Sequence, residues 1–312
     1  MKITKTRLAP TPSGYLHLGN VLSFLITVSL AKKHGAKILL RIDDLDHKRV
    51  KTEYIQDIFD TLDFLEIPYD EGPKSTKGFL QDYSQRNRLS IYKEFIDELK
   101  EKSKVFACEC SRKTLLNKHP KRWYTGTCLD RNLPLDKKQT ALRIITDLTH
   151  TININLYNEV NKPHHLTDAM IFFIVQKKDT YPSYQLASMA DDIYFNVDFI
   201  VRGIDLWHST LAQVYLSSQL PMQQTFNQAV FYHHQLYKEE GKKLSKSNGS
   251  YAIRQMIKAG TKKEEIYKRI GNHLHLPQLT TNLEEFSSQF LLQLDLSSKS
   301  GIVNSSPPLK AD

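Results

Sequence analysis

The stretch that most constrains the fold lies near the start of the chain, at residues 7–20, which read RLAPTPSGYLHLGN. Residues 3–8 alternate between apolar and polar side chains, as a half-buried strand does. Residues 21–33 are largely apolar and lead to Gly35, so they predict a helix that stops there. The stretch is therefore a strand-to-helix turn. In an open parallel α/β sheet, such turns bind ligands beyond the carboxyl end of the strand.

The composition of this turn favours a nucleotide whose phosphate reacts. The turn lacks the spacing G-x-G-x-x-G, so it is not a dinucleotide fingerprint. It carries instead a cation, Arg7, together with His17 and several hydroxyl groups, next to a predicted helix N-terminus that favours phosphate. The alternative interpretation is a rigid surface turn in which His17 only caps the helix.

A second stretch, residues 243–249, reads KLSKSNG and follows an apolar run at residues 229–232. Its two lysines, Lys243 and Lys246, alternate with the small hydroxyl residues Ser245 and Ser247 and are followed by a glycine. Such a loop can wrap a polyphosphate and neutralise its charge. The alternative is a solvated basic loop.

Together the two stretches resemble the paired signatures of the class I aminoacyl-tRNA synthetases. Residues 17–20 (HLGN) match the histidine-containing element of that family, and residues 243–247 (KLSKS) match its lysine loop. The leading residues 7–14 (RLAPTPSG) narrow the likeness to the glutamyl and glutaminyl branch. The resemblance implies a Rossmann-type α/β catalytic domain that activates an amino acid with ATP and Mg²⁺.

The resemblance also implies roles for the residues of both motifs. His17 donates a hydrogen bond to the charge that develops on the phosphate, and Gly19 lets the adenosine approach the backbone, where a Cβ would obstruct it. The lysines meet the charge on the pyrophosphate, Lys246 above all. The implied catalytic residues are His17, Lys243 and Lys246, and the implied ATP-binding residues are His17, Gly19, Asn20 and Lys246.

Recognition of glutamate needs a cation for the side-chain carboxylate, and arginine offers a bidentate fork. Arg7 and Arg202 lie at the ends of predicted strands and match family positions for glutamate, although either could instead form a surface ion pair. Asp43 follows another predicted strand and is placed to accept a hydrogen bond from the amino group of glutamate. The full predicted glutamate set is Arg7, Ala9, Thr11, Asp43, Tyr184 and Arg202.

Three positions depart from the family pattern. Asp43 stands where the family usually has glutamate, which shortens the reach by one methylene. Gln185 stands where relatives often carry asparagine, and Asn20 replaces the second histidine of the general class I element. The substitution at Asp43 bears most directly on how the amino acid is held.

All three cysteines, Cys108, Cys110 and Cys128, fall within residues 105–166. Clustered cysteines in a cytoplasmic chain suggest a metal, and zinc needs four tetrahedral ligands. Chemistry alone prefers His119 as the fourth ligand. The segment resembles the short glutamyl-Q tRNA(Asp) synthetases, whose Cys-x-Cys, tyrosine and final cysteine match Tyr124 instead and imply a structural zinc. Three buried structural thiols are the remaining alternative.

The order of predicted elements indicates a Rossmann fold split by an insert. The predicted segments are a first catalytic half (1–104), a cysteine-bearing insert that contacts the tRNA acceptor end (105–166), a second half with the lysine loop (167–250), and a short helical segment with a tail and no anticodon-binding domain (251–312). Strands are predicted at 3–8, 36–42, 171–176 and 199–203, with a loop at 69–78. Helices are predicted at 21–33, 53–65, 86–102, 184–190, 206–216, 253–259 and 263–273, and a polar tail at 297–312.

Charge and length suggest the partner. The net charge of +9 favours an anionic macromolecule, and nucleic acid is the commonest. No apolar run approaches a membrane span and no signal-peptide pattern is present, so we expect a cytoplasmic monomer. Only 65 residues follow Ser247, whereas a full glutamate–tRNA ligase carries a large C-terminal anticodon-reading domain.

Glutamyl-Q tRNA(Asp) synthetases end similarly and attach glutamate to the queuosine base of aspartate tRNA. The leading hypothesis is therefore ATP-dependent glutamylation of queuosine in the anticodon stem-loop of tRNA(Asp). A truncated glutamate–tRNA ligase that charges a 3′ end is the nearest rival. A non-catalytic paralogue that binds RNA or amino acid is the alternative from a different class.

Overall fold

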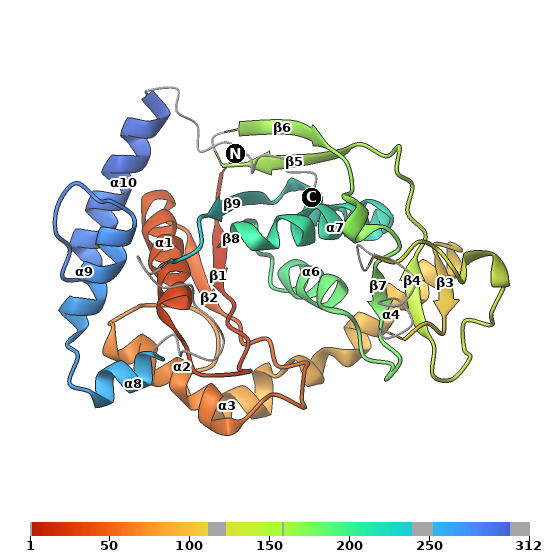
Figure 1. The fold of residues 1–312 in the computed structure, drawn as a ribbon, viewed down its shortest axis with the longest axis horizontal. Coiled ribbons are helices and arrows are strands. Elements are labelled where there is room, and N and C mark those ends of the chain that lie inside the picture. Colours follow the sequence, from red (N-terminus) through yellow and green to blue (C-terminus); the bar gives the residue numbers. More distant parts are fainter. Residues whose placement is uncertain (1, 112–122, 158, 239–251, 300–312) are drawn as a thin grey trace. The chain divides into compact units, whose positions relative to one another are not determined.

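The computed structural model describes residues 2–111, 123–157, 159–238 and 252–299. The chain divides into two compact units, and each is built from several stretches of sequence (Figure 1). The first comprises Met1–Gln85, Phe199–Ile204 and Tyr232–Asp312, and the second comprises Arg86–Asp198 and Asp205–Phe231.

The first unit is built around a parallel strand pair and a long buried helix. β1 (Lys5–Leu8) pairs in parallel with β2 (Lys37–Leu40), with Arg7 opposite Leu39. Most side chains of α1 (Leu18–His34) are buried, and the helix ends at Gly35, whose φ of 62° is the left-handed conformation typical of a helix stop. The unit also contains β8 (Phe199–Gly203), α2 (Thr52–Phe64), α3 (Thr76–Gly78), α8 (Ile253–Lys258), α9 (Lys263–His273) and α10 (Leu283–Lys299).

The second unit contains an antiparallel sheet in the order β3-β4-β7 and a ladder in which β5 lies between β6 and β9. β5 pairs antiparallel with β6 and in parallel with β9, where Asn155 lies opposite Val230. β9 (Val230–His234) crosses from the second unit into the first. The other elements are α4 (Leu89–Glu101), β3 (Val105–Cys108), β4 (Ala141–Ile144), β5 (Ile152–Leu156), β6 (Glu159–His164), β7 (Ile174–Gln176), α6 (Tyr184–Tyr194) and α7 (Trp207–Ser218).

The structure corrects three predicted elements. The predicted strand at 171–176 exists as β7, but it pairs antiparallel with β4 and does not resume a parallel sheet. The helix predicted at 184–190 continues through Asp191, whose carboxylate is buried and accepts hydrogen bonds from Arg88 and Tyr92. The predicted loop at 69–78 ends in the single helical turn of α3.

A further correction concerns the end of the chain, where a helix was missed. α10 forms after α9 and lies alongside α1 (Figure 1). The Ser29 hydroxyl donates to the Ser287 hydroxyl at 2.9 Å between buried faces, and Lys33 pairs with Asp295 at 2.7 Å. Only the last residues of α10 overlap the tail that the sequence predicts from residue 297.

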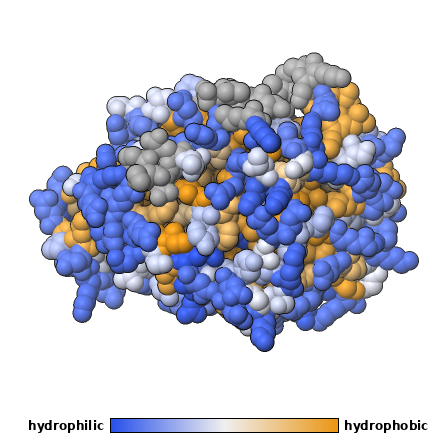
Figure 2. All heavy atoms as spheres, turned by 180° about the vertical axis from the view of Figure 1, so that it is seen from behind, coloured by the Kyte–Doolittle hydropathy of each residue, from blue (hydrophilic) through white to orange (hydrophobic). Residues whose placement is uncertain are grey.

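Figure 2 shows the hydropathy of the described residues on one face of the molecule. Hydrophilic side chains predominate there, and hydrophobic ones are interspersed among them. Among the described helices, none combines the length and the apolar character that crossing a membrane requires.

Candidate active site and candidate metal centre

His17 is the N-cap residue of α1, immediately before the first helical residue, Leu18. The His17 Nδ1 accepts a hydrogen bond from the Gly19 N–H at 3.1 Å, and the Asn20 Oδ1 accepts one from the His17 N–H at 3.0 Å. Both bonds satisfy N–H groups that the first turn of a helix leaves without partners, as a capping box does. Because Nδ1 is an acceptor, the neutral ring carries its proton on Nε2, which is thus a donor. Desolvation lowers the pKa of His17 and favours this neutral form.

Gly19 allows the imidazole to lie over the start of the helix. A Cβ at Gly19 would approach the Cε1 and Nδ1 of His17 at 3.0 and 3.1 Å, and the Cβ of Tyr237 at 3.8 Å. The first two distances are shorter than ordinary van der Waals contact. The structure therefore brings His17, Gly19 and Asn20 together and makes the histidine's position depend on the glycine.

The two predicted glutamate-binding arginines are buried and lie on strands that contact each other. Arg7 on β1 and Arg202 on β8 are each 4% exposed, which is inconsistent with surface ion pairs. The Arg7 Nη1 donates to the Val201 carbonyl oxygen at 3.1 Å. Arg7 is thereby fixed beside the strand that carries Arg202.

Asp43 lies against the turn that follows β1, because its N–H donates to the Pro10 carbonyl oxygen at 2.9 Å. Its carboxylate forms a buried, bidentate pair with Arg41, at 2.8 Å to Nε and 3.0 Å to Nη2. The turn after β1 and the pair with Arg41 thus fix the position of the Asp43 carboxylate.

The remaining predicted residues are placed differently. Ala9 is half-buried and Thr11 is exposed in the same turn as His17. Tyr184 is the first residue of α6 in the second unit, and it is 44% exposed. The three residues Lys243, Lys246 and His119 lie outside the described residues.

Sequence reasoning missed the residues that hold the loop after β2. The Asp44 carboxylate accepts hydrogen bonds from the Ser84 hydroxyl at 2.6 Å and the Gln85 N–H at 2.8 Å. The Gln85 Oε1 in turn accepts the Leu45 N–H at 3.0 Å. The Arg-x-Asp spacing of Arg41 and Asp43 was the available signal for their pairing, since residues two apart on an extended chain share a face.

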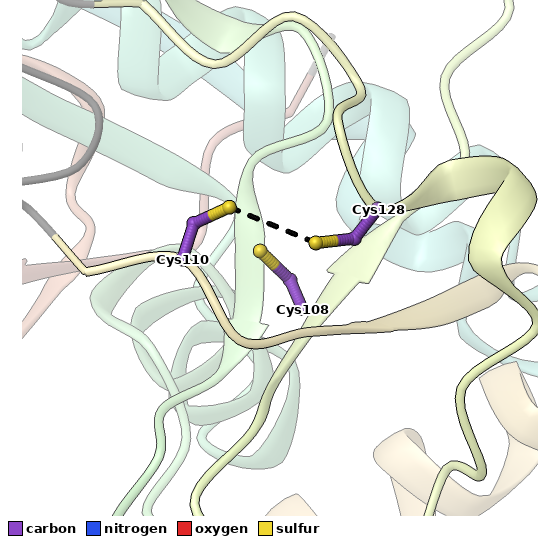
Figure 3. A group of neighbouring side chains, drawn as sticks. All are labelled: Cys108, Cys110 and Cys128. Atoms are coloured by element: carbon purple, nitrogen blue, oxygen red, sulfur yellow. Dashed lines mark hydrogen bonds between the residues drawn. The ribbon is translucent and has the colours of Figure 1, made fainter. Parts of the chain in front are cut away.

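The three cysteines converge in the second unit, and their sulfurs point toward one another (Figure 3). All three Sγ atoms lie within 4.8 Å of one another, with 3.6 Å between those of Cys110 and Cys128, and no disulfide joins them. Zn–S bonds of about 2.3 Å at tetrahedral angles place sulfurs about 3.8 Å apart. The spacing of the thiols thus fits a shared zinc ion.

Tyr124 lies beside this cluster. Its hydroxyl oxygen accepts a hydrogen bond from the Cys128 N–H at 2.8 Å and also interacts with the Cys108 thiol. The Tyr124 oxygen is therefore held next to the sulfurs, where a fourth ligand is needed. The described residues thus place one oxygen donor beside three sulfur donors.

The cluster favours ionisation at one thiol. Burial raises the pKa of Cys128, but hydrogen bonds from the Glu109 N–H and from the Tyr124, Cys110 and Arg131 side chains outweigh it and lower the pKa to about 7. Burial and the neighbouring thiols raise the pKa of Cys110 to about 12. Burial likewise raises the pKa of Tyr124. A divalent cation would stabilise the deprotonated forms of all the ligands together.

Comparison with known proteins covers nearly the whole chain. Residues 3–299 match the profile of the family described as tRNA synthetases class I (E and Q), catalytic domain. The chain is 28% identical over 316 residues to glutamate–tRNA ligase 2 of Syntrophus aciditrophicus (strain SB), covering 96% of this chain and 63% of that protein. It is 31% identical over 270 residues to the glutamate–tRNA ligase of Buchnera aphidicola subsp. Cinara cedri, and the match covers 83% of this chain and 54% of that protein.

Two solved structures share the fold. The glutamate–tRNA synthetase of Elizabethkingia anophelis superposes with a TM-score of 0.70 at 19% identity, covering 92% of this chain and 66% of that one. A glutamate tRNA ligase of Elizabethkingia meningosepticum, solved in complex with its amino acid, gives a TM-score of 0.70 at 20% identity. The match covers 93% of this chain and 65% of that one. The chain thus spans about two-thirds or less of the length of each of these proteins.

Proposed function

The chain belongs to the family of class I tRNA synthetase catalytic domains for glutamate and glutamine, and from this premise we propose that it activates glutamate with ATP. The observation that carries the proposal is the set of polar side chains in the first unit. His17 caps the N-terminus of the buried helix α1. Arg7 and Arg202 are buried on contacting strands. Asp43 lies against the turn between β1 and α1. These are the donors and acceptors that an α-amino acid with a second carboxylate requires.

In the proposed reaction, an oxygen of the glutamate α-carboxylate attacks the α-phosphorus of ATP. A carboxylate–phosphorus bond forms as the bond from that phosphorus to pyrophosphate breaks, which leaves glutamyl-adenylate and pyrophosphate. The Nε2–H of His17 donates to the charge that develops on the phosphate. Lys243 and Lys246 neutralise the pyrophosphate, and Mg²⁺ accompanies the ATP.

For glutamate, we assign Arg7 and Arg202 to the side-chain carboxylate and Asp43 to the amino group. The position of Asp43 against the turn after β1 supports this role in spite of its shorter side chain. Thr11 and Tyr184 add hydroxyl contacts, and Ala9 completes the proposed set. Asn20 supports the nucleotide site through its hydrogen bond to the His17 backbone.

A substitution at Gly19 tests the geometry of the nucleotide site. We expect Gly19→Ala to raise the KM for ATP and lower ATP–pyrophosphate exchange, together by roughly 10- to 100-fold, because the new Cβ displaces the imidazole that it would approach at 3.0 Å. The measurement is exchange against ATP concentration. Gly14→Ala is the matched control, since a Cβ there meets no atom within 4 Å. Equal activity of Gly19→Ala and wild type would contradict the assignment.

We also propose that Cys108, Cys110, Cys128 and Tyr124 hold one structural zinc ion. The resemblance to the short glutamyl-Q enzymes and the convergence of these side chains support the assignment. The bound ion would fix the loop that carries Tyr124 and Cys128 onto β3. His119 is the rival for the fourth position.

Metal analysis tests the centre directly. We expect the purified chain to contain about one zinc per molecule, and Cys108→Ser to lose most of it because a hydroxyl is a poor zinc ligand. Tyr124→Phe is expected to weaken binding, whereas His119→Ala leaves it unchanged. The reverse order of these two effects would make His119 the fourth ligand. A metal-free wild type that takes up no added Zn²⁺ would refute the site.

For the acceptor, we propose the queuosine base of tRNA(Asp), held through the anticodon stem-loop. The Cys-x-Cys, tyrosine and cysteine pattern supports this choice, because its spacing resembles that of the short glutamyl-Q enzymes. An anticodon base is single-stranded and can enter a protein pocket. The second candidate, charging of a tRNA 3′ end, is favoured by the relatives named glutamate–tRNA ligase.

Transfer of labelled glutamate distinguishes the candidates. The labelled amino acid and ATP are supplied with tRNA(Asp) with or without queuosine, and with tRNA(Glu). Label found only on queuosine-containing tRNA(Asp), and retained after removal of the 3′ end, is the expected result. Label on tRNA(Glu) that is lost with the 3′ end would mean charging. Absence of pyrophosphate exchange in the wild type would leave the non-catalytic alternative, and Lys246→Ala provides the inactive reference.

A further inference from the structure

Arg143 is a buried cation whose charge the described part of the protein does not balance with a carboxylate. It lies on β4 and is 6% exposed. Its Nη1 donates to the Phe172 carbonyl oxygen at 2.8 Å, and its buried Nε has no hydrogen-bond partner among the described residues. None of the ion pairs between described residues includes Arg143. Because an uncompensated buried charge is costly, an anion is expected nearby.

The cluster of Cys108, Cys110 and Cys128 could carry that negative charge, and the Tyr124 ring connects it to Arg143. The guanidinium carbon of Arg143 lies 3.8 Å from the centre of the Tyr124 ring, within the range of a cation–π contact. The hydroxyl of the same ring is the oxygen held beside Cys108 and Cys128. Arg143 therefore contacts Tyr124, the predicted fourth ligand. Among the described residues, no hydrogen bond joins Arg143 to a cysteine sulfur.

A metal centre at this place would be an anion. Three thiolates around a divalent cation give a net charge of −1, and a phenolate as fourth ligand gives −2. We propose that Arg143 is the counter-ion of this centre and the positioning residue that makes Tyr124 its fourth ligand. This inference rests on the zinc site proposed above.

The packing around Tyr124 explains how Arg143 positions the ring. The Phe172 carbonyl that anchors the guanidinium belongs to a residue with a φ of 49°, and the Phe172 ring packs edge-on against Tyr124 at 6.3 Å. Phe106 stacks on Tyr124 at 6.2 Å and lies directly opposite Arg143 in the β3–β4 ladder. Arg143, Phe106 and Phe172 thus confine one ring.

A double-mutant cycle on Zn²⁺ affinity tests the inference. The full-length chain is stripped of metal, and its Zn²⁺ affinity is measured by competition with a chromophoric chelator. We expect Arg143→Gln to weaken binding roughly 10- to 100-fold, the range typical of residues that support a metal ligand. In a Tyr124→Phe background, the same change should weaken binding by roughly threefold or less, because the ligand through which Arg143 acts is gone.

Two further variants separate this role from a general effect on charge or folding. Arg143→Lys keeps the charge without the planar fork and should lose less affinity than Arg143→Gln. Lys93→Gln removes one positive charge of the same unit from a side chain that is 76% exposed and paired with Asp97, and it should change the affinity by roughly twofold or less. Co²⁺ spectra of each variant report whether the three thiolate ligands remain.

The outcomes are distinct. If Arg143→Gln weakened Zn²⁺ binding equally in the wild type and in the Tyr124→Phe background, the inference would be overturned. An Arg143→Gln variant with the Zn²⁺ affinity of the wild type would also overturn it. Equal losses in Arg143→Gln and Lys93→Gln would mean that net charge alone matters, which also overturns it. A wild type that binds no Zn²⁺ would refute the proposed metal centre and this inference together, whereas glutamate activation could still be measured.

Discussion

Replacing His17 with alanine is expected to lower ATP–pyrophosphate exchange by roughly 10²- to 10³-fold, the usual cost of removing one donor to a developing negative charge. The structural reason is the tautomer. The Gly19 N–H occupies Nδ1, so Nε2–H is the donor that the substitution removes. The same change removes a helix cap, which costs about 1 kcal/mol of stability. Exchange and thermal unfolding should be measured on the same preparations.

His17→Asn separates catalysis from capping, because asparagine is a good N-cap at any pH. We expect this variant to keep the stability of the wild type at pH 7.5 and to remain poorly active. Desolvation lowers the pKa of His17 in the folded chain relative to about 6.5 in the unfolded chain. The histidine cap therefore contributes fully above that value, and its contribution is lost as the pH falls through the lower folded pKa.

The stability difference between wild type and His17→Asn should consequently shift in favour of the asparagine variant between pH 7.5 and 5. A difference that is independent of pH would mean that the ring does not accept the Gly19 N–H. Full exchange activity in His17→Asn would mean that an amide donor suffices or that the side chain has no catalytic role.

Local signals predicted much of the first unit. The helix between the turn and Gly35 is confirmed as α1, because the apolar run and the glycine stop both act within the helix itself. The strand at 199–203 and the helix at 263–273 are confirmed with the same bounds. These elements have strong patterns of their own, so little information from distant residues is needed.

Elements that depend on distant partners were harder to predict. α10 has many polar residues in its sequence, and buried Phe286 and Phe290 together with the bond between Ser287 and Ser29 tie it to the first unit. The pairing partner of β7 is set by tertiary contacts, and a three-residue strand carries too little pattern to reveal it. Tertiary packing decided both cases.

The candidate sites, too, were predictable from the sequence only in part. The Cys-x-Cys pair and the spacing to Cys128 are visible in the sequence, and the convergence of the three thiols is found in the structure. The role of Arg143 is not visible in the sequence, because it depends on the register that places Arg143 opposite Phe106. Conversely, Lys243 and Lys246 were identified from their motif alone, and their roles stay predictions.

Replacing Arg202 with lysine is expected to raise the KM for glutamate by roughly 10- to 100-fold and to reduce the preference for glutamate over glutamine. Lysine keeps the positive charge but loses the planar fork that binds both carboxylate oxygens. The effect should be large because Arg202 is buried, so water screens its interaction with a ligand poorly. The measurement is amino-acid-dependent pyrophosphate exchange with glutamate and with glutamine.

Arg7→Lys should raise the KM for glutamate similarly and should also lower the melting temperature, since it removes the buried hydrogen bond to the Val201 carbonyl. Lys5→Gln is the control on the same strand. Its partly exposed pair with Glu71 contributes to stability only, so the KM should not change. If Arg202→Lys raised the KM for glutamate and glutamine equally, its guanidinium would be supporting the strand and not recognising the carboxylate. A selective loss for glutamate is the result that only direct recognition of the side-chain carboxylate explains.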